Sequence, residues 1–316
     1  MLVGVLYGLS ACALWGIVYL MPLFLPQYDS LYLAIGRAFV MGAVSVGIVI
    51  GLFSQFRVLS QKDWRFATKL TLIGNLLQPW FVMLSVSFAG VAVAGICFGA
   101  VPVLVALISN ERDKRMGKPY VSLKKLSLPL LCIVIGFVAI NATELEVFLR
   151  QGEASSGSFF FGLACGLIST AMWTWYPIRN ADWLLAHPKV SPAVWTCAQS
   201  VVLLPVSTLL YLAVWYFDDS MPSLLGVTPW RFVFFMLLAG VCCAWLAATL
   251  WNACSAKLPT ALVGQLLVFE TIFSVVYGQI WRMEWPTLTL CWGFALLLIG
   301  ISVSLRFFNQ IKSNSI

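Results

Sequence analysis

Apolar stretches long enough to cross a lipid bilayer follow one another along almost the whole chain, and this pattern constrains the fold more than any single motif. A hydrocarbon core about 30 Å thick requires roughly 20 apolar residues per helical crossing. Of the 316 residues, 61% are hydrophobic and only 10% are charged. A soluble core could not bury so much apolar surface. The sequence therefore predicts an all-α polytopic membrane protein without a soluble domain.

We expect ten transmembrane helices. They cover residues 3–24, 31–53, 66–86, 89–109, 124–141, 158–178, 193–216, 229–250, 259–281 and 287–306. A single helix over residues 66–109 would be about 66 Å long, twice the hydrocarbon thickness, so a turn is expected within residues 85–90. The long apolar run over residues 230–281 is interrupted at Pro259, and proline is favoured at helix starts.

The distribution of basic side chains predicts the orientation of the bundle, because Lys and Arg accumulate in short cytoplasmic loops. With the N-terminus inside, fifteen of the 19 Lys and Arg residues fall on the cytoplasmic side. Both termini are therefore expected in the cytoplasm, and the protein in the inner (plasma) membrane. Since the basic residues are dispersed over several loops, the net charge of +7 is a topology signal and does not indicate nucleic-acid binding.

An internal repeat relates the two halves of the chain. The pattern Gly4-x3-Gly8-Leu9-x3-Ala13-x-Trp15 recurs half a chain later as Gly162-x3-Gly166-Leu167-x3-Ala171-x-Trp173. Because each half holds an odd number of helices, equivalent helices would cross in opposite directions, as in the inverted repeats of secondary transporters. The predicted units are a first five-helix repeat (1–141), an acidic linker (142–157), a second five-helix repeat (158–308) and a cytoplasmic tail (309–316).

Several motifs spread over nearly the whole chain resemble the drug/metabolite transporter (DMT) superfamily, and within it the ten-helix EamA-type transporters. They are the Gly-rich openings ending in Trp15-Gly16 and Trp173, Arg37, Pro102-Val-Leu-Val-Ala-Leu, Phe269-Glu270-Thr-Ile-Phe-Ser and Met283-Glu284-Trp-Pro-Thr. Glu270 falls on the acidic position of a Leu-Glu-Pro-Val signature, with Thr271 in place of the proline. The resemblance implies two inverted five-helix repeats around a central cavity, and export of amino acids or other small metabolites.

Glu270 is the leading candidate site residue, because it lies near the middle of the ninth predicted span. A carboxylate at that depth usually marks a substrate or proton pathway. It can exchange protons or pair with a cationic substrate amine. The alternative is a structural role, as a protonated carboxyl group hydrogen-bonded to a neighbouring helix.

Other polar and aromatic side chains at depth can face a cavity or join helices. Asn75 and Gln78 are three residues apart in the third span and share one helix face. The aromatic residues can hold an organic cation by cation–π attraction or simply pack. The remaining cavity candidates are Trp80, Trp15, Tyr19, Trp173, Tyr176, Trp245 and Gln265, with Gln199 and Trp251 open to the same two interpretations.

Three further residues have a more specific expectation. Arg37, early in the second span, is expected to snorkel to the outer interface or form a structural pair, with contact to a substrate carboxylate as the alternative. Pro102 and Pro177 are candidate hinges, although ordinary membrane packing explains them equally well.

The sequence thus favours a secondary active transporter, an exporter of small amino acids or amphipathic or aromatic amines, with protons as a candidate coupling ion. The expected partners are a small-molecule substrate and the lipid bilayer. A monomer is expected, because ten helices can form a complete bundle for alternating access. No cofactor, metal or nucleic acid is expected, since no corresponding motif is found. A lipid or lipid-linked-sugar flippase is the main alternative; an intramembrane enzyme or a channel is disfavoured, because neither a catalytic constellation nor a filter segment is recognisable.

Overall fold

A computed structural model describes residues 1–142, 146, 156–217 and 225–313, and all regular structure within these ranges is helical. Ten helical segments are long and apolar enough to cross a membrane, so the predicted fold class and number of spans are confirmed. In hydrocarbon, the backbone N–H and C=O groups must pair within each segment, and a helix satisfies them all. Most of the predicted linker at 142–157 lies outside the described residues.

The first half contains five spans, and most of them consist of more than one helix. They are built from α1 (Leu2–Val18) with α2 (Met21–Phe24); α3 (Ser30–Gly51); α5 (Gln61–Thr71), the π-helix η1 (Leu72–Leu77) and α6 (Gln78–Ala89); α7 (Val91–Gly99) with α8 (Val101–Arg115); and α9 (Leu123–Ile140). The short α4 (Phe53–Phe56) joins the second span to the third.

The second half again contains five spans. They are built from α11 (Ser156–Ala186); α12 (Pro192–Ser200) with α13 (Leu203–Phe217); α14 (Pro229–Leu238), the π-helix η2 (Ala239–Leu246) and α15 (Ala247–Ser255); α16 (Thr260–Leu266) with α17 (Val268–Arg282); and α18 (Leu288–Ser313).

Helix boundaries follow local signals in the sequence. The turn expected within residues 85–90 occurs at Gly90, whose φ of 88° disfavours residues with a side chain. Pro259 occupies the N-cap of α16, as predicted. α11 and α18 extend beyond the apolar runs, to Ala186 and Ser313, because polar residues continue a helix outside hydrocarbon. The predicted tail from residue 309 is therefore partly helix.

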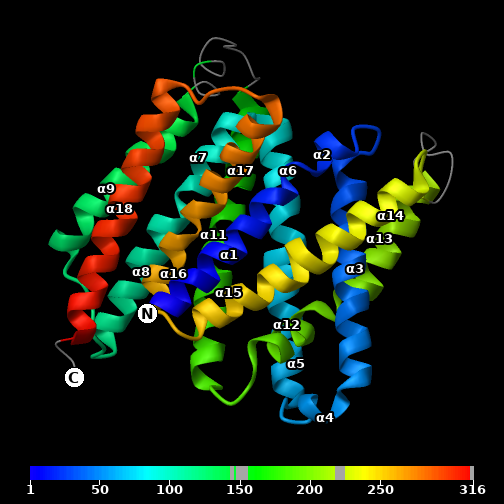
Figure 1. Cartoon of the computed structure of the whole chain (residues 1–316), viewed down its shortest axis with the longest axis horizontal. Helices are drawn as coiled ribbons and strands as arrows, with labels where there is room; N and C mark the ends of the chain where they lie inside the picture. The colour runs from blue at the N-terminus through cyan, green and yellow to red at the C-terminus, as the bar shows by residue number, and fades with distance from the viewer. Residues whose placement is uncertain (143–145, 147–155, 218–224, 314–316) are drawn as a thin grey trace.

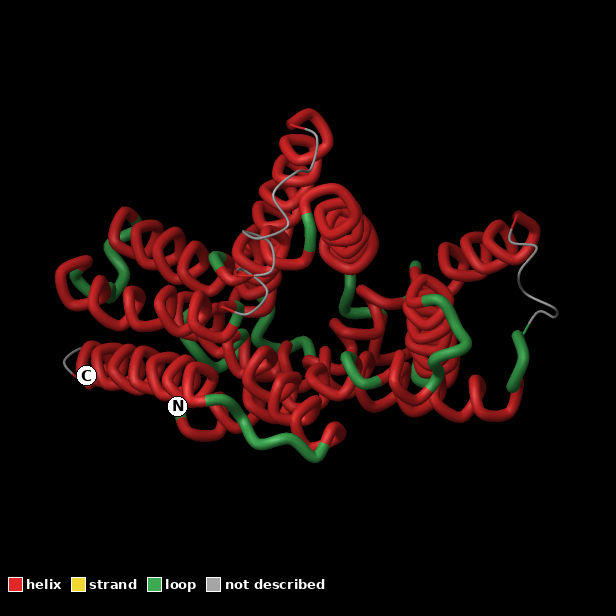
Figure 2. The backbone as a smooth tube through the Cα atoms, turned by 90° about the horizontal axis from the view of Figure 1, so that it is seen from above, coloured by secondary structure: helices red, strands yellow, loops and turns green. Residues whose placement is uncertain are grey.

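The even number of spans places both chain ends on one side of the bundle. We call it the terminal side; α4 also lies there, at the bottom of Figure 1, while α2 lies on the opposite side. Seen from above, α9 and α18 form one flank of the elongated bundle and α13 with α14 the other (Figure 2). The helices that carry the candidate site lie between these flanks.

Glycines of the repeated motif allow spans from the two halves of the chain to pack closely. A Cβ at Gly8 in α1 would lie 2.8 Å from Leu266, and a Cβ at Gly166 in α11 would lie 2.8 Å from Ser85. The first span packs on the eighth and ninth, and the sixth packs on the third and fourth. The first and sixth spans therefore each pack on spans of the other half. The second span likewise packs on the seventh, and the fifth packs on the tenth.

Backbone irregularities also recur between the halves. η1 starts at Leu72 and η2 starts at Ala239. The spacing in sequence between these two starts equals the spacing between the breaks at Ala100 and Leu267. The third and eighth spans contain the π-helices, and the fourth and ninth contain the breaks. Because such irregular segments leave backbone groups free, they commonly occur at functional sites.

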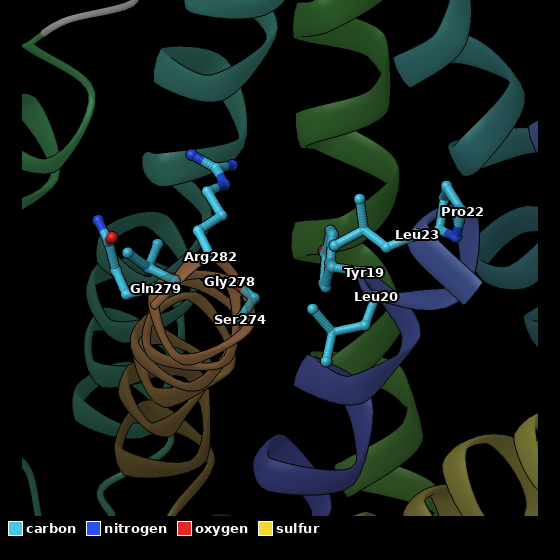
Figure 3. A pocket seen from close by; sticks show the side chains of 9 residues that line it. Tyr19, Leu20, Pro22, Leu23, Ser274, Gly278, Gln279 and Arg282 are labelled. Carbon is cyan, nitrogen blue, oxygen red and sulfur yellow. The ribbon is translucent and has the colours of Figure 1, made fainter. Parts of the chain in front are cut away.

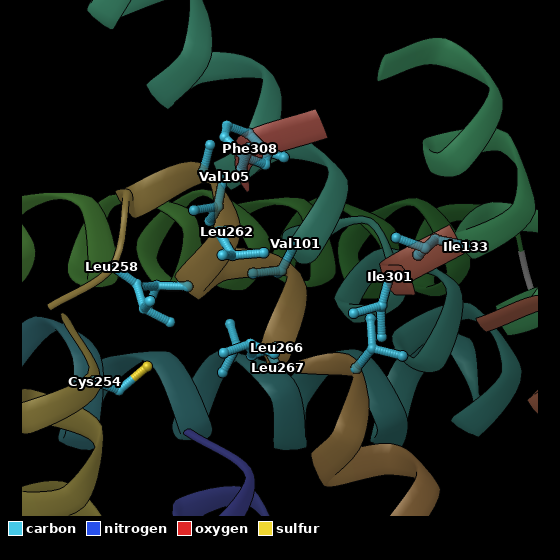
Figure 4. Close-up of a cluster of buried hydrophobic side chains, with 14 of the residues drawn as sticks. Val101, Val105, Ile133, Cys254, Leu258, Leu262, Leu266, Leu267, Ile301 and Phe308 are labelled. Atoms are coloured by element: carbon cyan, nitrogen blue, oxygen red, sulfur yellow. The ribbon is translucent and has the colours of Figure 1, made fainter. Parts of the chain in front are cut away.

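The central helices are fixed to one flank by a continuous apolar core. Val105 of α8, Leu262 of α16 and Ile301 of α18 are almost inaccessible to solvent and belong to one cluster (Figure 4). Leu266, at the end of α16, belongs to the same cluster. Leu267 and Val268 belong to it too, so this packing holds the chain on both sides of the break at Leu267.

Candidate functional site

A cavity of about 420 Å³ lies at the centre of the bundle, where eight of the ten spans contribute to its wall. The volume lies within the range typical of small-molecule sites. Of the residues considered from the sequence, those that line it are Trp15, Tyr19, Arg37, Asn75, Gln78, Trp173, Tyr176, Gln199, Trp251 and Glu270. Side chains far apart in the chain therefore converge on one chamber.

Glu270 lies in the first turn of α17, directly after the break at Leu267. Its side chain accepts a hydrogen bond of 3.1 Å from the Tyr19 hydroxyl group. The N-terminus of a helix carries partial positive charge, which favours a carboxylate at this position. The break thus provides a favourable electrostatic environment for an acid in mid-membrane. A carboxylate has more acceptor capacity than this one bond uses, so it can also bind a proton or a cation.

Arg37 of α3 lines the same cavity. Among the described lining residues, Glu270 and Arg37 are the two charged ones. From this position Arg37 can contact a substrate anion or form a structural pair with Glu270. The cavity therefore offers one acidic and one basic group to a ligand.

Aromatic rings form much of the remaining wall. Trp173 and Tyr176 of α11 stack with centroids 5.3 Å apart and an interplanar angle of 2°. Trp15 of α1 contacts Trp251 of α15 at a centroid distance of 5.3 Å. Gly74 leaves room for the Tyr176 ring, because a Cβ at this position would lie only 2.5 Å from that ring. Such a wall suits an apolar or cationic ligand.

The π-helix of the third span brings two amides to the cavity. Asn75 lies within η1, and Gln78 begins α6, where its side chain donates a hydrogen bond of 3.0 Å to Ser169 of α11. The Tyr176 hydroxyl group lies close to the amides of Asn75 and Gln199. These groups can orient a polar ligand opposite Glu270.

A buried polar network lies between the cavity and the terminal side. The Asn180 Oδ1 accepts hydrogen bonds from Gln199 at 2.7 Å and from Trp195 at 2.8 Å. Its Nδ2 donates to Asn252 at 2.8 Å, and Asn252 donates to Thr196 at 2.9 Å. All five side chains are buried. The sixth, seventh and eighth spans are therefore tied together below the cavity.

Charged residues tie further spans together nearer the terminal side. Arg112 of α8 donates two hydrogen bonds to the Asp182 carboxylate of α11, at 2.8 and 2.5 Å. The neighbouring Trp183 donates to Asp63 of α5 at 2.8 Å. Together they tie the third, fourth and sixth spans. We call the Asn180 network and these pairs the terminal-side closure.

Three residues predicted to line the cavity lie outside it. Trp80 is 54% exposed, since two positions along a helix from Gln78 point to nearly the opposite face. Trp245 donates to the Cys197 sulfur at 3.3 Å and packs among helices. Gln265 is fully buried in α16, and its amide has no hydrogen-bond partner among the described residues.

The two proline candidates lie at different kinds of position. Pro102 is at the start of α8, next to the break at Ala100, and Pro177 is inside α11, between the cavity and the terminal-side closure. Gly74, Phe98 and Ser200 also line the cavity and were not predicted from the sequence. Small and apolar residues of this kind occur throughout membrane spans, so their residue types do not mark a cavity. Only the pairing of Gly74 with a bulky ring could have indicated a lining position.

Ten spans around a polar, aromatic-walled cavity define a multi-pass helical membrane protein of the transport type. The chain is 34% identical over 313 residues to inner membrane protein YtfF of Escherichia coli (strain K12), covering 97% of this chain and 96% of that protein. It therefore belongs to the same family of multi-pass inner membrane proteins. A solved crystal structure with 17% sequence identity shares the fold, with a TM-score of 0.74 over 98% of both chains. No family model matches the chain.

Proposed function

We propose that this protein is a secondary active transporter that binds a small amine-bearing molecule beside Glu270. One observation carries the proposal: Glu270 accepts a hydrogen bond from Tyr19 at the N-terminus of α17 and lines an aromatic-walled cavity near the middle of the ninth span. A carboxylate there can pair with an ammonium group, and the ring faces of Trp15 and Trp173 can add cation–π attraction.

Arg37 extends the recognition to a second charge. A substrate with both an amine and a carboxylate, such as a small amino acid, would place the amine at Glu270 and the carboxylate at Arg37. An amphipathic or aromatic amine would use Glu270 and the rings alone. Sugar phosphates are disfavoured, because phosphate recognition usually needs several cations and Arg37 is the one among the described lining residues.

Alternating access between two inverted halves is the proposed mechanism. It is supported by the exchange of packing partners between the halves and by the recurring breaks and π-helices. The resemblance to the DMT superfamily, and to EamA-type exporters within it, agrees with this mechanism. With both termini in the cytoplasm, the terminal-side closure would be the cytoplasmic gate, and the substrate would be exported. A proton exchanged at Glu270 is the candidate driving ion.

Binding to the purified protein tests this proposal. In a thermal-shift screen of amino acids, polyamines and quaternary amines, we expect at least one amine to raise the melting temperature. Glu270→Gln should weaken that amine about tenfold or more, because a hydrogen-bonded charge pair is lost. Glu284→Gln, which removes an exposed acid with the same change in net charge, is the matched control. Stabilisation by anionic sugars alone would contradict the proposal.

A further inference from the structure

A second cavity, of about 310 Å³, adjoins the central one on the side opposite the chain ends. It lies between the α1–α2 junction and α17, and we call it the α1–α17 slot (Figure 3). Tyr19 lines both cavities, so the slot begins where the Tyr19 hydroxyl group reaches Glu270. From there it extends along α17 to Arg282.

The slot exists because α1 and α17 are in contact at one level and apart at the next. Gly16 of α1 packs so closely that a Cβ there would lie 2.9 Å from Phe273 of α17. About one turn further along α17, a Cβ at Gly278 would meet no described atom within 4 Å. The first span breaks after Tyr19, and α2 turns away with Pro22.

The wall of the slot is apolar on one side where it leaves the Tyr19–Glu270 pair. Leu20, Pro22 and Leu23 form that side, while α17 contributes Val275 together with the polar Ser274 and Gln279, and Arg282 lies at the far end in its last turn. α1 and α17 lie side by side on the face of the bundle turned toward the viewer in Figure 1, which is a lateral face of a membrane protein. An alkyl group can therefore extend from the central cavity along α1 and α2.

We propose that the α1–α17 slot is a tail subsite, which holds the alkyl chain of an amphipathic amine whose ammonium group lies at Glu270. This inference rests on the proposed function and narrows its substrate class to amines with an apolar tail. Glu270 and Gly278 are two turns apart on one helix, about 12 Å, so an alkyl chain of roughly eight to ten carbons spans the slot. The head group is recognised by charge, and the tail by apolar contact.

A series of alkyltrimethylammonium ions tests the subsite, from tetramethylammonium to decyltrimethylammonium. Binding is measured by tryptophan fluorescence in lipid nanodiscs, with empty nanodiscs as the blank for membrane partition. We expect the affinity to rise by up to about fourfold per methylene, because each buried CH₂ adds to binding, and to level off once the slot is filled.

Gly278→Leu should fill the slot without a clash and lower the ratio of decyl to tetramethyl affinity at least tenfold. Gly47→Leu is the matched control, since Gly47 of α3 is equally open but lies outside both cavities. This variant should leave the ratio unchanged. Thermal melting of both variants checks that they fold.

The results separate the two proposals. If tetramethylammonium binding does not depend on Glu270, as tested by Glu270→Gln, the proposed amine site is wrong. If that binding depends on Glu270 but affinity is independent of chain length, or if Gly278→Leu and Gly47→Leu change the ratio equally, the tail subsite alone is overturned.

Discussion

The two ends of the central cavity are built from different interactions. On the terminal side, buried amides around Asn180 and the Arg112–Asp182 pair tie several spans together. On the opposite side, α1 and α17 separate beyond Gly16, and Tyr19 is 57% exposed. The terminal side is therefore held by directional bonds between spans, whereas at the opposite end, which we call the open end, glycines set the spacing of α1 and α17. The predictions below test that contrast.

The largest effect is expected from Asn180→Leu. The substitution removes the acceptor for Gln199 and Trp195 and the donor to Asn252, and leaves their buried polar groups unpaired. We expect the free energy of unfolding to fall by about 2 to 4 kcal/mol. Thermal melting in detergent measures the loss, with the exposed Asn309→Leu as control. An equal loss in both variants would show that the network does not hold this end closed.

A smaller effect is expected from Arg112→Gln. The Arg112 and Asp182 side chains are 30% and 32% exposed, so solvent screening limits their contribution to about 1 kcal/mol or less. The double variant Arg112→Asp with Asp182→Arg should recover part of the lost stability if the pair itself matters. If the double variant folds but recovers no stability, the effect of Arg112→Gln comes from other contacts of the two residues.

The smallest effect is expected at the open end, from Tyr19→Phe. The change removes one hydrogen bond to Glu270 and retains the ring. Because this hydrogen bond is exposed, affinity for tetramethylammonium should fall no more than about threefold, consistent with a net contribution near 0.5 kcal/mol. Tyr216→Phe, on the exposed end of α13, is the control and should have no effect. A loss as large as that of Glu270→Gln would mean that Tyr19 itself contacts the ligand.

The spans could be predicted because hydrocarbon thickness fixes the length of an apolar helix, and the turns at Gly90 and Pro259 because those residues have strong backbone preferences. Glu270 was identifiable from its depth alone. The break at Leu267 has no such signal, since neither proline nor glycine occupies that position. Leu267 is instead buried in the core between spans, and contacts of that kind cannot be read from one local stretch of sequence.

The terminal-side closure was also missed, for a related reason. Asn180 and Asp182 follow the sixth apolar run, where polar residues are ordinarily solvated. Their partners lie in distant segments and become neighbours only after the spans assemble. Trp80 illustrates the opposite error: its residue type suited a binding site, but the helix directs it outward. Residue type and depth therefore nominate candidates, and helix phase decides among them.

The break at Leu267 has a mechanical consequence for Glu270. The acid lies within one turn of this break, and the break itself is packed, since Leu266, Leu267 and Val268 all belong to the apolar core. Under the proposed function, a cation or proton that neutralised Glu270 would remove the attraction between its charge and the first turn of α17, next to that packing. Occupancy of the site would then act directly on the break, without a relay through the rest of the bundle.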